Sequence, residues 1–240
     1  MKLTKEEIKY IDNYLIKNEV KYWDVRLELL DHIVSAVEDK IENEGISLNE
    51  ALLEVHHGFG NRIHNGYSYE LDFEKALFID NKGFKKFTLK KQKEIGRKQR
   101  RHYWNTFLPF IISSHFLLEL LALILVMWLT YSYFDFKAAF FVLLGAIVIS
   151  EFSKIFIGGF KKFKSKSLNL QMAFTFVIFY TQAPYWFLNI FNWYFEDMTE
   201  KPYIILLIAL IVVFVFSRHS LNTYKYTYNI YKKRYDLLIS

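Results

Sequence analysis

The sequence predicts an all-α polytopic membrane protein, in which a bundle of four transmembrane helices follows a small cytoplasmic three-helix domain. Charge divides the 240-residue chain into an acidic block, a basic stretch and an apolar block. Residues 1–81 hold 9 Lys and Arg against 17 Asp and Glu, residues 82–103 hold 10 against one, and residues 104–240 hold 12 against 7. Because the three blocks differ so strongly, each is interpreted separately.

Four apolar segments in the C-terminal part are each near the ~20 residues that a helix needs to cross a ~30 Å hydrocarbon layer. They cover residues 107–131, 138–158, 169–191 and 202–217, within a transmembrane region of residues 105–218. Lysine and arginine gather before the first segment, between the second and third, and after the fourth, whereas the two opposite loops hold one lysine each. The positive-inside rule therefore places both termini in the cytoplasm.

Five polar residues inside the predicted spans are candidates for a functional cluster: His115, Glu119, Glu151, Lys154 and Gln182. His115 and Glu119 share a helix face, and Glu151 is expected at a similar depth on the next span. Charged groups in a bilayer face the helix bundle and find partners. Two interpretations stay open, a proton- or cation-responsive cluster of His115, Glu119 and Glu151, or a protonated Glu119 that joins helices beside a local Glu151–Lys154 pair.

The acidic block, residues 1–81, predicts three short helices. "TKEE" at residues 4–7 and "SLNE" at residues 47–50 are capping boxes that open the first and third helices. The second helix is expected to begin near Trp23 and to end at Gly45, which suits the left-handed position after a helix. Such a small bundle is expected to be a partner surface rather than an enzyme.

The stretch "VRLELLDHIVSAVEDKIENEGISLNEALLEVHHGFGN" resembles the HAAS-type signalling domains and permease-prefix domains that precede membrane spans in bacterial proteins. The resemblance implies a cytoplasmic regulatory or coupling module in a bacterial cytoplasmic (inner) membrane protein, and it implies no chemistry. Glu28 and His32 could also bind a metal with Asp31 or with His56 and His57, although we expect a structural role for them. The residues that carry the resemblance are Glu28, Leu30, Asp31, His32, Gly45, Ser47, Glu50, Ala51, Phe59 and Gly60.

Residues 82–104 form a basic juxtamembrane hinge, which we expect to bind the anionic headgroups of the bilayer rather than nucleic acid. The tail, residues 219–240, is basic and rich in tyrosine, and an apolar seam at helical spacing predicts a helix that lies on the membrane or packs on the N-terminal domain or a second copy. The predicted headgroup ligands are Lys90, Lys91, Lys93, Arg97, Lys98, Arg100 and Arg101.

The chemistry-bearing motifs of enzymes are missing from the sequence. The chain has no cysteine, no HExxH motif and no paired nucleophile and base, so we expect no catalytic site, no metal and no cofactor. The predicted function is a non-enzymatic regulatory, scaffolding or accessory subunit that couples the membrane bundle to a cytoplasmic partner. The alternative is a transport or proton-responsive component that uses His115, Glu119 and Glu151.

Overall fold

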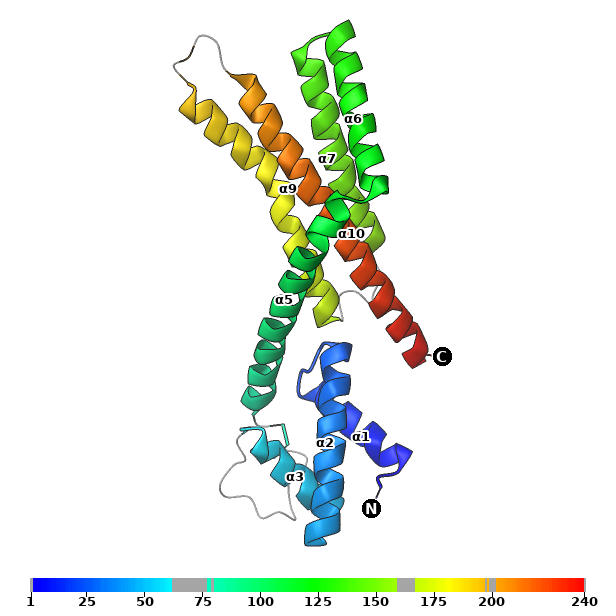
Figure 1. The fold of residues 1–240 in the computed structure, drawn as a ribbon. Helices are drawn as coiled ribbons and strands as arrows, with labels where there is room; N and C mark the ends of the chain where they lie inside the picture. The colour runs from blue at the N-terminus through cyan, green and yellow to red at the C-terminus, as the bar shows by residue number, and fades with distance from the viewer. Residues whose placement is uncertain are drawn as a thin grey trace. The chain divides into compact units, whose positions relative to one another are not determined.

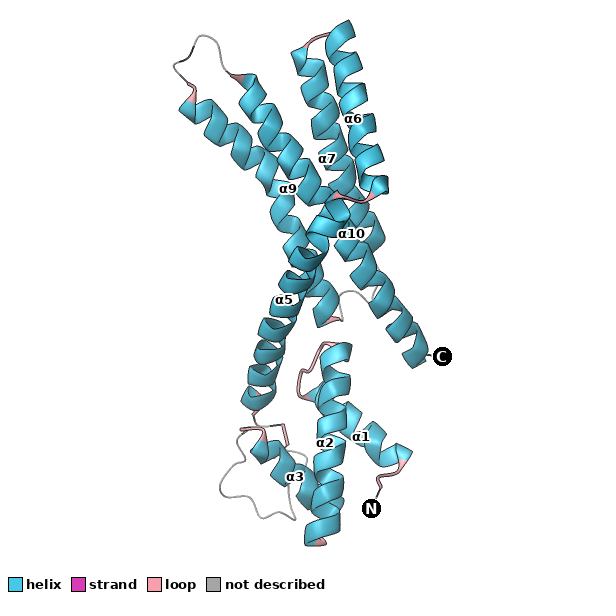
Figure 2. Cartoon of the chain, in the orientation of Figure 1, coloured by secondary structure: helices cyan, strands magenta, loops and turns pink. Residues whose placement is uncertain are grey.

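A computed structural model of the chain consists of helices joined by short turns and loops, with no strand among the described residues (Figures 1 and 2). The lysine-rich loop that the sequence places after the second span lies outside the described part. Side chains are not described at residues 158, 176–181 and 239. The described residues are 2–61, 77–78, 80–158, 167–196, 198 and 202–239.

The described helices fall into two compact units. Unit 1 comprises residues 1–95 and 165–169, and unit 2 comprises residues 96–164 and 170–240. Two helices, α5 and α9, contribute residues to both units. The helices are α1 (Lys5–Lys17), α2 (Trp23–Glu44), α3 (Leu48–Gly58), α5 (Lys82–Ile111), α6 (Ser114–Tyr133), α7 (Phe136–Gly158), α9 (Leu168–Tyr194) and α10 (Tyr203–Ile239).

In unit 1, α2 packs against both α1 and α3 around an apolar core. Both predicted capping boxes are present, since Thr4 and Glu7 cap α1 reciprocally and Ser47 and Glu50 cap α3 in the same way. Gly45 ends α2 with φ of 68°, a left-handed conformation that costs glycine little. The fully buried aliphatic side chains of this core include Ile11, Leu15, Leu29, Ile33, Val37, Ala51 and Leu52.

The start of α5 belongs to unit 1. The Phe84 side chain is 1% exposed, and its ring centroid lies 5.9 Å from that of Tyr14 and 5.5 Å from that of Phe59. The Gly83 amide donates to Asn61 Oδ1 at 2.8 Å. A Cβ on Gly83 would lie 2.2 Å from the Phe59 carbonyl oxygen, so only glycine allows this approach. The basic helix is therefore anchored in the acidic unit through apolar packing.

The predicted first span, residues 107–131, is divided in the structure. The helix that begins in the basic hinge continues to Ile111, with Pro109 in its last turn, and α6 begins separately at Ser114. Ser113 has extended backbone, with ψ of 136°, and its hydroxyl accepts from the Phe116 amide at 3.3 Å. Proline removes one backbone donor near the end of α5, and the serine caps the next helix, so the break has a local cause.

Three helices of unit 2 are long and apolar enough to cross a membrane, which supports a membrane protein. They are Ser114–Tyr133, Phe136–Ile157 and Tyr203–Leu238, and the search covered only the described residues. The predicted third span falls on α9, a 27-residue helix that runs through Pro184 and is not among the three. In this unit α7 packs against α6 and α10 around a core of Phe116, Met127, Ala139, Leu143, Ile147, Leu206, Leu210, Val213 and Phe214.

The tail continues α10 without a break, and its predicted seam packs within unit 2. Tyr224 and Tyr228 are almost fully buried, Tyr224 beside Ala173 and Tyr228 beside Leu170. Tyr231 and Tyr235 continue this contact further along α10. The tyrosines of the seam therefore pack on the beginning of α9. Neither a second copy nor the membrane surface is needed to bury these tyrosines.

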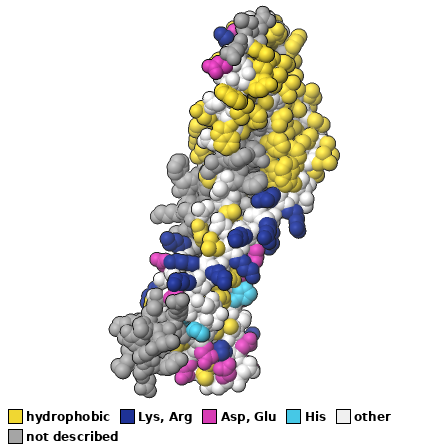
Figure 3. Space-filling view, turned by 90° about the vertical axis from the view of Figure 1, so that its left-hand side faces the viewer, with side chains coloured by type: hydrophobic (Ala, Val, Ile, Leu, Met, Phe, Trp, Pro, Cys, Tyr) yellow, Lys and Arg dark blue, Asp and Glu magenta, His cyan; other side chains and the backbone are white. Residues whose placement is uncertain are grey.

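Apolar side chains remain exposed on the outside of unit 2 (Figure 3). Leu118, Leu121, Phe141 and Ile149 are each more than 60% exposed, as expected for helices that face lipid. Figure 3 also shows Lys and Arg side chains gathered in a band apart from this apolar area. The contrast agrees with the segregation of charge and apolarity in the sequence.

Candidate functional site

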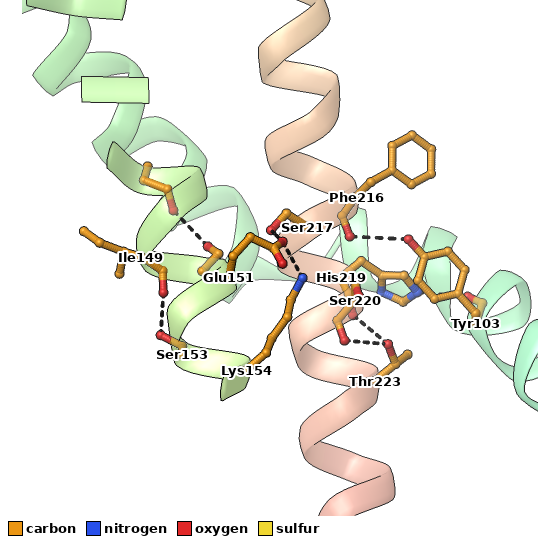
Figure 4. Close-up of polar contacts among 12 residues, drawn as sticks. Tyr103, Ile149, Glu151, Ser153, Lys154, Phe216, Ser217, His219, Ser220 and Thr223 are labelled. Atoms are coloured by element: carbon orange, nitrogen blue, oxygen red, sulfur yellow. Dashed lines mark hydrogen bonds and ion pairs between the residues drawn. The ribbon is translucent and has the colours of Figure 1, made fainter. Parts of the chain in front are cut away.

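A buried ion pair on α7 is hydrogen-bonded to α10 (Figure 4). Glu151 and Lys154 are one turn apart on α7, and the Lys154 ammonium donates to Glu151 Oε1 at 2.5 Å. Ser217 of α10 donates its hydroxyl hydrogen to the same oxygen. The side chain of Lys154 is 0% exposed and that of Glu151 is 9% exposed, so water does not screen the pair. Glu151 Oε2 is buried and has no hydrogen-bond partner among the described residues.

A second ion pair joins α6 to α10. Glu119 Oε1 lies 2.5 Å from an Nη atom of Arg218, and both side chains are partly buried. Glu119 is five residues into α6, so it lies about 8 Å along the helix from the first residue rather than near the middle of a long span. The break before α6 thus brings Glu119 to the level of Arg218. Glu119 is thus in contact with an arginine of α10.

The two ion pairs contact consecutive residues of α10. Ser217 donates to Glu151 of the first pair, and Arg218 is itself a member of the second. Two carboxylates and two cationic groups balance in charge, which is the arrangement that allows ionised groups to persist in a low-dielectric region. The Glu119–Arg218 pair joins α6 to α10, and the Ser217 hydrogen bond to Glu151 joins α10 to α7, so both contacts restrain the packing of these helices. The cluster can therefore stabilise the bundle, and Glu151 Oε2 is the one carboxylate oxygen of Glu151 without a hydrogen-bond partner among the described residues.

His219, the next residue of α10, binds the end of α5. Its Nε2 lies 2.9 Å from the Tyr103 carbonyl oxygen, so Nε2 is the protonated, donating nitrogen. The Tyr103 hydroxyl in turn donates to the Phe216 carbonyl at 3.3 Å (Figure 4). The ring centroids of Tyr103 and His219 are 4.4 Å apart. The side chain of His219 is fully buried. This double contact fixes α5 against α10 within unit 2.

A small cavity lies beside this contact, with a volume of about 30 Å³. That volume is enough for a water molecule. Ser220 reaches the cavity wall, is 1% exposed and has no hydrogen-bond partner for Oγ among the described residues. The other lining residues are Gln99, His102, Tyr103, Ala173, Thr223, Tyr224 and Thr227.

The structure joins only part of the polar cluster that the sequence predicts. Glu151 and Lys154 form the expected local pair, and Glu119 lies in the adjoining pair with Arg218. His115 and Gln182 are both exposed. Ser217, Arg218 and His219 are not among the predicted site residues, although a run of polar residues inside an otherwise apolar helix could have indicated them. They were expected to lie at or beyond the end of the last span, but α10 continues through them.

The residues that carry the family resemblance have structural roles in unit 1. Glu28 forms an ion pair with Lys91 of α5, and the His32 ring lies 6.4 Å from that of Phe87, whereas Asp31 is exposed. No group of three metal-ligating side chains occurs among the described residues. The caps at Gly45 and at Ser47 with Glu50, the buried Ala51, and the turn at Phe59 and Gly60 shape the ends of α2 and α3.

One histidine that the sequence offers only as a possible metal ligand is buried in unit 1. His56 of α3 is 0% exposed, and the Tyr14 hydroxyl lies 2.6 Å from its Nδ1. Burial lowers the pKa of His56 to about 4, against a smaller opposing effect of Asp80. Burial also raises the pKa of the Tyr14 hydroxyl. His56 is therefore neutral at pH 7 and accepts the Tyr14 hydrogen at Nδ1.

Comparisons with known protein families, with curated proteins and with solved structures found no match. The resemblance of residues 25–61 to bacterial signalling and permease-prefix domains therefore stays an expectation. The function has to be inferred from the contacts that this chain makes within itself.

Proposed function

We propose that the chain is a non-enzymatic, four-span protein of a bacterial cytoplasmic membrane that acts as a regulatory, scaffolding or accessory subunit. Its N-terminal helices couple the membrane helices to a cytoplasmic protein partner. Three helices with the length and apolarity of membrane spans support this proposal. The remaining span of the proposal, the third in chain order, is α9. Its 27 residues form a helix about 40 Å long with a mostly apolar sequence.

The observation that carries the coupling role is the continuity of α5. This helix is uninterrupted from Lys82 to Ile111. Its first turn holds Phe84 in the core of unit 1, and a later turn holds Tyr103 against His219 in unit 2. A helix transmits displacement along its axis because its backbone hydrogen bonds fix one turn on the next. Movement of the acidic unit would therefore reach the polar contacts on α10.

The exposed basic side chains of α5 fit a membrane surface. Lysine and arginine beside a span are attracted by anionic lipids, each by about 1 kcal/mol when close to the surface. Lys91 differs from the rest because it pairs with Glu28 and Glu94, so its contribution to lipid binding is smaller. The exposed candidates for headgroup contact are Lys90, Lys93, Arg97, Lys98, Arg100 and Arg101.

The membrane topology can be tested with introduced cysteines, because the chain has none of its own. Phe134 lies between α6 and α7 and Lys233 lies on α10, and both are exposed. We expect an impermeant thiol reagent to label Phe134→Cys in intact cells, and Lys233→Cys only after the membrane is opened. Labelling of Lys233→Cys from outside would contradict the proposed orientation.

The coupling role can be tested by affinity purification from membranes with the full chain and with a chain that lacks residues 1–81. The deletion removes the cover of Phe84, so the shortened chain also carries Phe84→Ser to avoid artificial apolar binding. We expect the full chain to retain at least one protein that the shortened chain loses. The full chain with Asp31→Ala, a change at an exposed position of α2, is the control for ordinary surface substitution. Identical sets of partners would refute the coupling role.

A second function, a proton- or cation-responsive component, is favoured by one observation. Glu151 is buried in an ion-pair cluster and has one oxygen without a partner among the described residues. A carboxylate in that position can take up a proton and then release Lys154 and Ser217. This function predicts proton flux or a pH-dependent change in the bundle, whereas the coupling role needs neither.

A further inference from the structure

One carboxylate lies at the beginnings of two helices that are far apart in the sequence. Asp24 is in the first turn of α2, and it accepts four hydrogen bonds from the beginning of α9. Its Oδ1 accepts from the Leu168 amide at 2.9 Å. Its Oδ2 accepts from the Ser167 hydroxyl at 2.9 Å, and from the amide and the side-chain Nδ2 of Asn169 at 3.0 and 2.9 Å.

The amides at the beginning of α9 have no acceptor within their own helix. The first amides of an α-helix have no acceptor within the helix, and the positive end of the helix dipole favours an anion there. A residue that directly precedes the helix normally supplies the cap. Here Ser167 gives its hydroxyl hydrogen to Asp24, and the cap comes from a residue more than 140 positions earlier.

The contact is also partly shielded from water. Ser167 is 0% exposed and Leu168 is 3% exposed, and Trp23, beside Asp24, is 7% exposed. Charge-assisted hydrogen bonds are stronger where water competes less. This contact could not be predicted from the sequence, because Asp24 is one of 17 acids in an acidic segment and nothing near it in the sequence indicates a partner.

We propose that Asp24 is a latch that holds the first turn of α2 on the first turn of α9, and that α9 loses its cap when the latch opens. The role of the latch in signalling rests on the proposed coupling function, since a partner that draws α2 away would release the predicted third span. The latch itself needs no partner. Asp24 and residues 167–169 all belong to unit 1.

Hydrogen exchange in the full, detergent-solubilised chain tests the latch directly. The Leu168 and Asn169 amides have Asp24 as their acceptor, so their protection reports this contact rather than the helix itself. We expect Asp24→Ala to speed their exchange roughly tenfold, which corresponds to about 1.4 kcal/mol and lies within the range for loss of a helix cap. Asp31→Ala, on the exposed face of the same helix, is expected to leave their exchange unchanged.

Asp24 also lies in the first turn of its own helix, so the α2 amides beyond Leu29 are followed in the same experiment. Exchange that stays slow there while it rises at residues 167–170 supports the latch. Exchange that is unchanged at residues 167–170 overturns it, and so does a general increase throughout α2. Asp24→Asn keeps one acceptor oxygen and is expected to give an intermediate exchange rate at the beginning of α9. If the lost charge acted only by destabilising α2, the faster exchange would not be confined to α9.

A cross-link gives a second, independent result. Asp24→Cys combined with Ser167→Cys places two thiols where an oxygen pair lies 2.9 Å apart, in a chain without other cysteines. We expect mild copper-catalysed oxidation by air to form the disulfide within one chain, detected by mass spectrometry of the digested protein. The pair Asp31→Cys with Ser167→Cys is the control. Failure of the first pair to cross-link, or equal cross-linking of both, would also overturn the latch, whether or not any partner is found.

Discussion

Glu151→Ala is expected to lower the free energy of unfolding by about 3–5 kcal/mol, because it leaves the ammonium group of Lys154 buried without its partner. The loss should be larger than for an ordinary surface ion pair, since the Lys154 side chain is 0% exposed. Ser217 would lose its acceptor at the same time. The measurement is the midpoint of unfolding by sodium dodecyl sulfate, followed by helical circular dichroism of the detergent-solubilised chain.

Two further variants separate the buried charge from a general effect of substitution. Glu151→Leu combined with Lys154→Met removes both charges and is expected to recover most of the lost stability, because apolar residues replace buried ion pairs with little cost. Ser153→Ala, on the same turn of α7, removes only a hydrogen bond to the Ile149 carbonyl and is expected to change the free energy by less than about 0.5 kcal/mol. A double variant as unstable as Glu151→Ala would show that the ion pair is not the cause.

The same double variant distinguishes the two proposed functions. A coupling subunit should keep its cytoplasmic partners after both charges are removed, because the N-terminal unit is unchanged. A proton-responsive component should lose its proton flux in liposomes, since no titratable group remains at the Glu151 position. Loss of the partner with a stable fold would instead show that the charged cluster itself takes part in coupling.

Unit 1 is expected to lose stability as the pH falls from about 6.5 to about 4. The folded pKa of His56, about 4, lies below the ordinary value of 6.5, so the unfolded chain binds the proton first. The contribution is fully present above pH 6.5 and is lost as the pH falls, by at most about 3 kcal/mol at the lower limit. Hydrogen exchange of the α1 and α3 amides, corrected for the intrinsic effect of pH, measures this loss.

The exposed neighbour of His56 gives a matched control for the pH effect. His56→Gln should remove most of the loss, because glutamine can accept the Tyr14 hydrogen but does not titrate. His57→Gln, at an exposed position on the same helix, should leave the loss unchanged. Equal pH profiles for the chain and for His56→Gln would contradict the assignment to this histidine.

The fold class and the ends of several helices could be predicted because their causes are local. Thr4 with Glu7 and Ser47 with Glu50 form caps across three residues, and Gly45 ends α2 through its own backbone freedom. The apolar segments are long enough to indicate spans by composition alone. Pro109 indicates in the sequence that α5 ends nearby. The cap that Ser113 forms for α6 can be recognised only once the end of α5 and the beginning of α6 are known.

The polar contacts could not be predicted, because each depends on which helices pack together. Glu119 meets Arg218, Glu151 meets Ser217 and Tyr103 meets His219, and the residues of each pair are separated by 66 to 116 positions. A helical pattern indicates which face is apolar but not which neighbour covers it.

The amino-acid order by itself therefore determined an all-helical chain, its apolar segments, its segregated charge and its helix caps, all of which arise from interactions within a few residues. Only the tertiary structure decided that Glu119 is paired with Arg218, that Phe84 anchors the basic helix in the acidic unit, and that Asp24 caps α9. The physical reason is that buried charges and unsatisfied helix ends accept any suitable partner within reach, and the packing of the helices determines which partner that is.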